Sequence, residues 1–167
     1  MNFALSVNNL KVHYFTQFGN VKAVEDVSFS LAKNESIGIV GESGCGKSTL
    51  GAALLRSVPY PGKIVDGQII LDTQNITNLS DTEFDKNIRW KQISMIFQGA
   101  LNSLDPVFTV GSQMKEILKQ HGYSKDDFDV ISDSLESVLL EPSITKKYPH
   151  ELSGGMKQRV AIAMALL

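Results

Sequence analysis

A glycine-rich segment that ends in a lysine and a serine constrains the fold of this chain more than any other feature. Residues 41–48 read Gly-Glu-Ser-Gly-Cys-Gly-Lys-Ser and fit the pattern G-x-x-x-x-G-K-[ST]. The apolar run at 36–40 before it is typical of a buried strand, and residues 49–56 after it are typical of a helix. This order of strand, glycine-rich loop and helix predicts a phosphate-binding loop in an α/β protein.

The residue types of this loop suit a nucleoside triphosphate and Mg²⁺. Glycines let the backbone N–H groups of residues 44–49 approach phosphate oxygens, and the start of a helix adds partial positive charge. Lys47 would place its charge between the β- and γ-phosphates, the Ser48 hydroxyl would bind Mg²⁺, and Thr49 would reach the α-phosphate. We interpret Cys45 as a small residue at a variable position of the loop rather than as a reactive thiol. The predicted nucleotide contacts are Gly41, Ser43, Gly44, Cys45, Gly46, Lys47, Ser48 and Thr49.

The remaining periodicities predict a β layer followed by helices. Apolar and polar residues alternate over 3–15 and 24–31, which predicts paired strands, and Asp66-Gly67 predicts a turn before a strand at 68–71. The apolar run at 92–97 predicts another strand. Helices are predicted over 110–120, from a cap at Ser124 to a stop at Pro142, and over 153–167.

Composition excludes several classes of function. The net charge of −2 provides no broad basic surface for nucleic acid or anionic lipid, and a single cysteine excludes an internal disulfide or a cysteine metal cluster. The start of the chain lacks the apolar core of a signal peptide, and no stretch approaches the ~20 apolar residues of a membrane span. These features predict a cytoplasmic protein.

A second motif lies at residues 152–159, which read Leu-Ser-Gly-Gly-Met-Lys-Gln-Arg. Ser153 can cap a helix whose first turn holds two glycines, each costing about 1 kcal/mol relative to alanine. A bare helix start with a hydroxyl suits a terminal phosphate. The motif resembles the LSGGQ signature of the ABC ATPases, and the resemblance implies that Ser153, Gly154 and Gly155 bind the ATP of a second subunit.

The resemblance extends over most of the chain and implies further roles. Gln98 is similar to the Q-loop glutamine, which is a catalytic and Mg²⁺-binding residue alongside the catalytic Lys47. Tyr14 resembles the aromatic residue that stacks on adenine, although Phe15 and Phe18 are alternatives. The flanks at 97–106 and 148–159 resemble the ATP-binding subunits of oligopeptide, dipeptide and nickel importers. Residues 160–167 resemble the first of the two paralogous ATPase subunits in such systems.

The resemblance implies an α/β fold of the P-loop NTPase class. It would contain an N-terminal antiparallel β layer, part of a RecA-like core sheet and an α-helical subdomain. The implied parts are 1–98 for the β layer and phosphate-loop core, 99–152 for the helical subdomain and 153–167 for the signature helix. The implied cofactors are ATP and Mg²⁺.

The function implied is an ABC-type ATPase subunit that drives uptake of peptides or similar small solutes. Its implied partners are a paralogous ATPase subunit, transmembrane permease subunits and, indirectly, an extracytoplasmic solute-binding protein. Such a subunit is cytoplasmic and peripheral on the inner face of the cell membrane. The alternative is a soluble ABC ATPase that acts on nucleic acid or the ribosome.

The family's Walker B strand and switch histidine follow the signature helix and have no counterpart in this sequence. His13, His121 and His150 precede or adjoin the signature, so none of them can be the switch histidine. We therefore expect an N-terminal fragment with a truncated core. Loss of a general base alone costs ~10²–10⁴ in rate, so the chain is expected to bind nucleotide and hardly to hydrolyse it.

Overall fold

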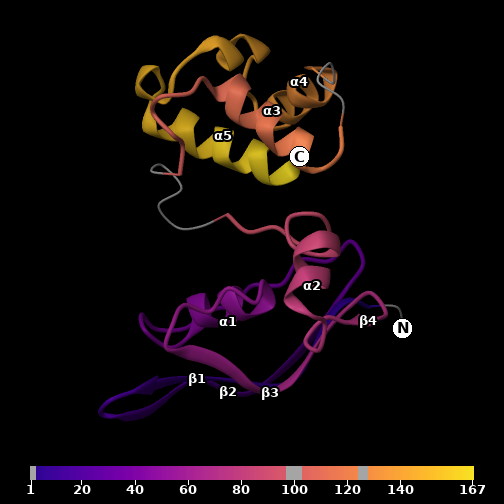
Figure 1. Ribbon diagram of the computed structural model, residues 1–167, viewed down its shortest axis with the longest axis vertical. Helices are drawn as coiled ribbons and strands as arrows, with labels where there is room; N and C mark the ends of the chain where they lie inside the picture. Colours follow the sequence, from indigo (N-terminus) through magenta and orange to yellow (C-terminus); the bar gives the residue numbers. More distant parts are fainter. Residues whose placement is uncertain (1–2, 97–102, 124–127) are drawn as a thin grey trace. The chain divides into compact units, whose positions relative to one another are not determined.

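The computed structural model describes residues 3–96, 103–123 and 128–167. Contacts along the chain divide it into two compact units, Met1–Ile93 and Ser94–Leu167. The first unit is built on a sheet and the second is helical (Figure 1). The division into parts 1–98, 99–152 and 153–167 stays a prediction.

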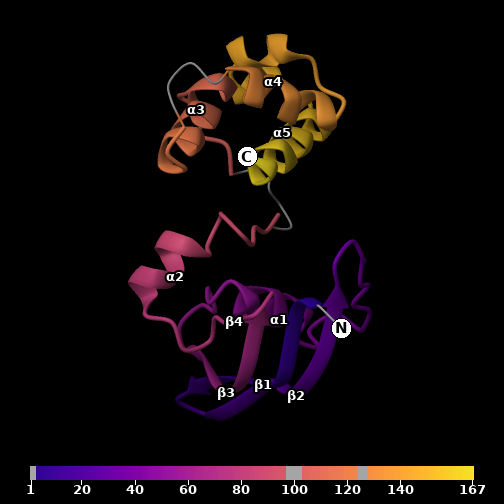
Figure 2. The same ribbon diagram turned by 90° about the vertical axis from the view of Figure 1, so that its right-hand side faces the viewer.

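The first unit consists of a four-stranded antiparallel sheet with α1 on one face (Figure 2). Its strands, in the spatial order β2-β1-β3-β4, are β1 (Phe3–Thr16), β2 (Gly19–Ala32), β3 (Gly62–Leu71) and β4 (Gln74–Asn75). In the described residues of this unit, helix α1 (Lys47–Leu54) lies between β2 and β3 in the sequence, and helix α2 (Asp81–Asn87) follows β4. Val7, Val12 and Ile69 of the sheet are fully buried in one cluster with Leu50 of α1 and Phe84 of α2. The two alternating patterns therefore predicted the first hairpin correctly.

The predicted core strands at 36–40 and 92–97 are wrong for the residues that the structure describes. Residues 35–42 adopt no regular structure, and Val40 is 95% exposed. In the second segment the structure has an isolated bridge between Arg89 and Ile93, and Phe97 lies outside the described residues. A parallel strand needs a hydrogen-bonded neighbouring strand, and no strand in the described part of the chain pairs with either segment. The predicted RecA-like sheet is therefore not formed there.

The predicted turn at Asp66-Gly67 is also wrong, because both residues lie inside β3. Gly67 has φ of 96°, and a β-carbon on it would come within 2.5 Å of the Leu10 Cα atom. The register between β1 and β3 shifts at this point, between Asn8 and Lys11. Glycine here permits a bulge with close backbone approach rather than a chain reversal.

In its described residues, the second unit packs three α-helices and two short 3₁₀ helices around its own core. These are α3 (Val110–Gln120), α4 (Phe128–Ser137), η2 (Pro142–Lys146), η3 (Pro149–Glu151) and α5 (Gly154–Leu166). Helix α3 has its predicted bounds and is capped by Thr109. Helix α4 ends at Ser137, so the predicted stop at Pro142 is wrong: that proline begins η2 instead. The predicted cap at Ser124 lies outside the described residues.

Helix α5 belongs to the same core as α3 and α4. Its buried Val160 and Ala163 share a cluster with Met114 of α3 and with Ile131 and Leu135 of α4. Among the described residues, no helix combines the length and the apolar character of a membrane span.

Candidate nucleotide-binding site

The glycine-rich loop at 41–46 leads directly into α1. Gly44 and Gly46 have φ of 83° and 99°, a region in which side chains with a β-carbon are strained. Gly46 is the N-cap of α1, and no side chain caps the helix. The first N–H groups of α1 therefore lack a side-chain partner, which is the arrangement that a phosphate group requires.

Lys47 turns its ammonium group back onto this loop. Its Nζ donates to the carbonyl oxygens of Gly41 at 2.7 Å and Glu42 at 2.6 Å, and it lies 3.5 Å from the Cys45 sulfur. These contacts place a positive charge inside the curve of the loop. The predicted contacts at Ser43, Cys45 and Ser48 are all exposed around it.

The main chain of strand β2 packs against the loop at Gly46. A β-carbon on Gly46 would lie 2.1 Å from the Ala23 carbonyl oxygen and 3.8 Å from the Val24 side chain. Sequence reasoning missed Ala23 and Glu42, because each contributes a carbonyl oxygen and any residue type supplies one. No pattern of side chains could have found them.

Tyr14 is the predicted aromatic residue that reaches α1. Its hydroxyl lies 3.4 Å from the Thr49 hydroxyl, two residues into the helix. Phe15 points to the other face of the sheet because side chains alternate along a strand, and its ring packs against His13. Phe18 is 92% exposed at the hairpin. The geometry therefore favours Tyr14 over both alternatives as the aromatic neighbour of the loop.

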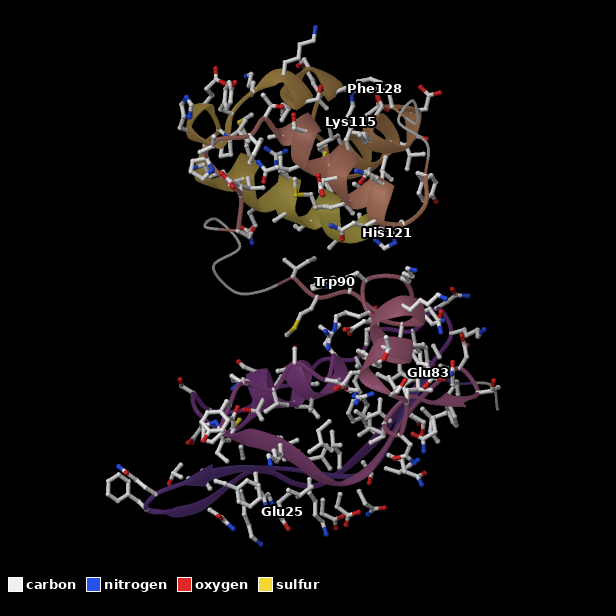
Figure 3. The ribbon with its side chains drawn as sticks, viewed as in Figure 1. Glu25, Glu83, Trp90, Lys115, His121 and Phe128 are labelled. Atoms are coloured by element: carbon white, nitrogen blue, oxygen red, sulfur yellow. The ribbon has the colours of Figure 1, made fainter. Side chains whose placement is uncertain are left out.

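The opposite face of the sheet carries a contact between a histidine and a glutamate instead. His13 Nε2 lies 2.8 Å from a Glu25 carboxylate oxygen, and Glu25 is on the face away from α1 (Figure 3). The hydrogen bond from His13, with some contribution from Lys22, lowers the pKa of the Glu25 carboxyl. This pair stabilises the hairpin on the far side from the loop.

The signature motif forms the start of α5 as predicted. Ser153 is the N-cap, and its hydroxyl oxygen accepts a hydrogen bond from the Met156 N–H at 3.3 Å. A β-carbon on Gly154 or Gly155 would have no atom within 4 Å. Packing within the described chain therefore gives no reason for two glycines at this helix start.

The residues just before the signature, 148–151, are held by contacts with one another. The Glu151 carboxylate accepts a hydrogen bond from the Tyr148 N–H at 2.7 Å, and the rings of Tyr148 and His150 stack at 5.6 Å. Arg159 of α5 donates to the Leu139 carbonyl oxygen at 2.9 Å, which connects α5 to the segment just after α4. Gln98, the predicted catalytic and Mg²⁺-binding glutamine, lies outside the described residues.

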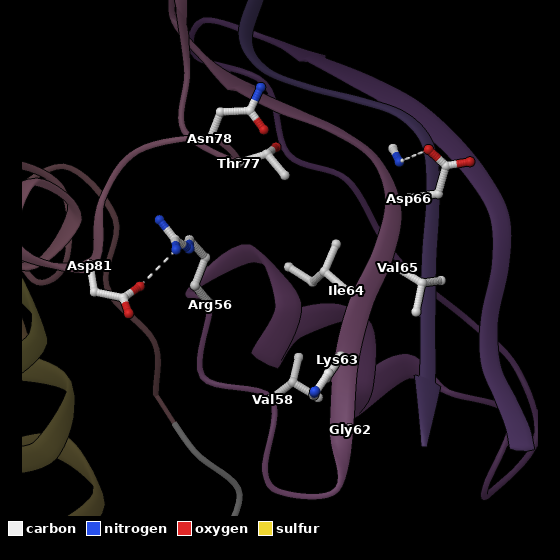
Figure 4. A pocket seen from close by; sticks show the side chains of 11 residues that line it. Arg56, Val58, Gly62, Lys63, Ile64, Val65, Asp66, Thr77, Asn78 and Asp81 are labelled. Carbon is white, nitrogen blue, oxygen red and sulfur yellow. Dashed lines mark hydrogen bonds and ion pairs between the residues drawn. The ribbon is translucent and has the colours of Figure 1, made fainter. Parts of the chain in front are cut away.

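A hollow of about 750 Å³ lies against β3 in the first unit (Figure 4). None of its lining residues belongs to the phosphate loop, and most are polar. They are Arg56, Val58, Gly62, Lys63, Ile64, Val65, Asp66, Gly67, Thr77, Asn78 and Asp81. The predicted nucleotide contacts therefore lie elsewhere, around the start of α1.

Comparison with solved structures shows the same fold. The dimeric structure of MJ0796, a bacterial ABC transporter cassette, matches with a TM-score of 0.81 and 28% identity over 97% of this chain and 68% of that one. A post-hydrolysis state of the same cassette with ADP and Pi matches with a TM-score of 0.78. The predicted fold class, an ABC ATPase of α/β type, is confirmed.

Comparison with curated proteins confirms the resemblance to peptide-transport ATP-binding proteins. The chain is 42% identical to the dipeptide transport ATP-binding protein DppD of Bacillus subtilis, over 100% of this chain and 51% of that protein. It is 45% identical to the oligopeptide transport ATP-binding protein OppD of Escherichia coli, over 98% of this chain and 49% of that protein. The chain thus spans about half the length of these relatives. The sequence model of the ABC transporter family matches residues 24–167, and the chain belongs to that family.

Proposed function

We propose that this chain binds ATP with Mg²⁺ as part of an ATP-binding subunit that energises peptide uptake through an ABC importer. The observation that carries the proposal is the position of the Lys47 ammonium inside a glycine-lined loop at the start of α1. Phosphate oxygens would take over the ammonium's hydrogen bonds from the Gly41 and Glu42 carbonyl groups. The N–H groups at the start of α1 would donate to the same phosphates.

The residues present fit a nucleotide with Mg²⁺. Tyr14 lies beside Thr49, so an adenine ring stacked on it would be next to the helix that holds the phosphates. Ser48 is exposed at the start of α1, where its hydroxyl can bind a cation held by phosphate oxygens. In the described part of the chain, no cluster of three or more His, Cys, Asp or Glu residues could hold a metal ion alone. Mg²⁺ is thus proposed to arrive with the nucleotide, and Gln98 to contribute a further ligand.

The signature residues are proposed to serve a second ATPase subunit. The space around Gly154 and Gly155 leaves the start of α5 open to an incoming phosphate group, with the Ser153 hydroxyl beside it. The MJ0796 cassette, which matches this fold, was solved as a dimer. A paralogous partner, permease subunits in the membrane and a solute-binding protein outside it complete the proposed assembly. ATP hydrolysis and peptide uptake are proposed for that whole assembly, with this subunit on the cytoplasmic face.

Calorimetric titration with MgATP tests the binding step. Lys47→Ala removes the loop's charge and is expected to weaken MgATP binding at least tenfold. Lys63→Ala is the matched control, because Lys63 is exposed in the same unit and lies outside the loop. Equal MgATP affinity in Lys47→Ala and the unsubstituted protein would contradict the assignment.

A further inference from the structure

Arg89 joins the end of the phosphate-loop helix to the chain that follows α2. Its Nη2 donates to the carbonyl oxygens of Leu55 at 3.2 Å and Arg56 at 3.4 Å, which directly follow α1. Its Nη1 lies 2.8 Å from an Asp85 carboxylate oxygen on α2. One guanidinium group therefore links the residues that follow α1 to helix α2.

The contact with Arg89 places a positive charge at the C-terminal end of α1. The last carbonyl groups of a helix have no partner within the helix, and a cation nearby stabilises them. Helix α1 has no basic residue in its last turn, so the guanidinium of Arg89 provides this charge from another element. Since α1 has eight residues, the Arg89 contact lies only about 12 Å from Lys47 along the helix axis.

The buried ring of Phe84 contacts both Arg56 and Arg89. Its ring is 1% exposed and lies 5.0 Å from the guanidinium carbon of Arg56 and 5.2 Å from that of Arg89. Arg56 in turn donates to the Leu79 carbonyl oxygen and forms an ion pair with Asp81 at 2.7 Å (Figure 4). The guanidinium groups of Arg56 and Arg89 thus contact the same buried ring and hold the end of α1 against α2.

The backbone of Arg89 belongs to the turn that follows α2. Arg89 forms a bridge with Ile93, and the Trp90 N–H donates to the Ile93 carbonyl oxygen at 2.9 Å. Trp90 lies just beyond α2 and is 45% exposed (Figure 3). Ile93 precedes the predicted Q-loop glutamine, Gln98, by five residues in the sequence.

We infer that Arg89 is a positioning residue that transmits nucleotide binding from α1 to the turn at 88–93. The inference rests on the proposed function. A shift of α1 on binding phosphate moves the Leu55 and Arg56 carbonyl groups. The guanidinium of Arg89 follows them, and the turn moves because it contains the Arg89 backbone. Nucleotide occupancy thereby reaches the segment that leads to Gln98 without any contact between Arg89 and the nucleotide.

Trp90 provides the measurement, because it is the single tryptophan of the sequence and adjoins Arg89. Intrinsic fluorescence is recorded at saturating MgATP for each protein, so that differences in affinity do not affect the amplitude. The unsubstituted protein is expected to show a fluorescence change, and Arg89→Ala to reduce its amplitude at least threefold. Arg89→Lys is expected to reduce it similarly, because a lysine keeps the charge but cannot hold both carbonyl groups and Asp85 together. If Arg89→Ala does not fold, Arg89→Lys decides the matter.

Lys91→Ala is the matched control. Lys91 is the other cation next to Trp90, and its ammonium contacts the Lys86 carbonyl oxygen rather than α1. It should keep the full amplitude, with thermal unfolding recorded in parallel to show that every variant is folded. A full amplitude in both Arg89 variants, or an equal loss in Lys91→Ala, overturns the inference. Calorimetry separates the two claims: MgATP binding without a fluorescence change in the unsubstituted protein refutes the inference alone, whereas no binding refutes the proposed function as well.

Discussion

The carbonyl oxygen of Ala23 occupies the space that a β-carbon on Gly46 would need, with only 2.1 Å between the two positions. Gly46 also has φ of 99°. The phosphate loop therefore rests on the main chain of β2 at a point where no side chain fits.

Gly46→Ala is expected to displace the loop from β2. The strained φ alone costs of the order of 1–3 kcal/mol, and the contact with Ala23 adds to this. We expect a lower free energy of unfolding in urea and at least a tenfold loss of MgATP affinity by calorimetry. Gly38→Ala is the control, because a β-carbon there meets no atom within 4 Å. Normal nucleotide binding by Gly46→Ala would show that β2 does not fix the loop.

Tyr14→Ala should weaken MgATP binding far more than Phe15→Ala. Stacking of an aromatic side chain on a nucleic-acid base is worth about 1–3 kcal/mol, which corresponds to roughly a fivefold or greater loss of affinity. Phe15 is on the opposite face of the sheet and should change the affinity less than twofold. Tyr14→Trp should retain binding because it keeps an aromatic face. Comparable losses in Tyr14→Ala and Phe15→Ala, measured by calorimetry, would reject Tyr14 as the adenine neighbour.

Gly154→Ala is expected to stabilise the isolated subunit and to impair its assembly. Alanine favours a helix over glycine by up to about 1 kcal/mol, and a β-carbon here meets no atom of the described chain. The free energy of unfolding should therefore rise, while MgATP-dependent association with the partner ATPase subunit, measured by sedimentation, should weaken. Undiminished association would mean that the start of α5 is not the subunit contact.

The start of α2 should respond to acid. Ser80 caps α2, and the Glu83 carboxylate accepts hydrogen bonds from the Ser80 hydroxyl and the Ser80 N–H. These two hydrogen bonds, that from the hydroxyl first, lower the pKa of Glu83 below its ordinary 4.5. Because this pKa is lower in the folded state, the stabilisation is complete above about pH 4.5 and is lost as the pH falls through the folded-state pKa.

Thermal unfolding of Glu83→Gln between pH 7 and pH 3 measures this effect. The variant should be less stable than the unsubstituted protein near neutral pH, and the difference should shrink in acid. Asp129→Asn is a suitable control, since Asp129 is likewise an acidic residue in the first turn of a helix, α4. A difference that stays constant with pH would show that the Glu83 carboxylate contributes nothing through its charge.

The sequence predicted those elements whose patterns need only local or neighbouring partners. The β1–β2 hairpin and α3 followed from alternation and helical periodicity, and the Ser153 cap followed from the residue type. The segments at 36–40 and 92–97 have the apolar composition of core strands, yet composition does not reveal whether a neighbouring strand is available. Periodicity therefore predicted their type and not their pairing.

The motif and the resemblance selected Lys47 and Tyr14 as candidate site residues from their side chains. The Lys47 ammonium contacts loop carbonyl groups and the Tyr14 hydroxyl lies beside Thr49, and their contacts with phosphate and adenine stay predictions. The supporting carbonyl groups of Ala23 and Glu42 could not be predicted because the backbone is the same at every position. The contact of Arg89 with the end of α1 could not be predicted either, because it depends on a tertiary arrangement.

Each of the two units encloses its own set of buried side chains, one around Phe84 and the other around Met114. We expect a substitution at a buried position to destabilise first the unit whose core it damages. Loss of hydrogen-exchange protection confined to the amides around one cluster would then assign an uncharacterised variant to the sheet-based unit or the helical unit before any assay of activity.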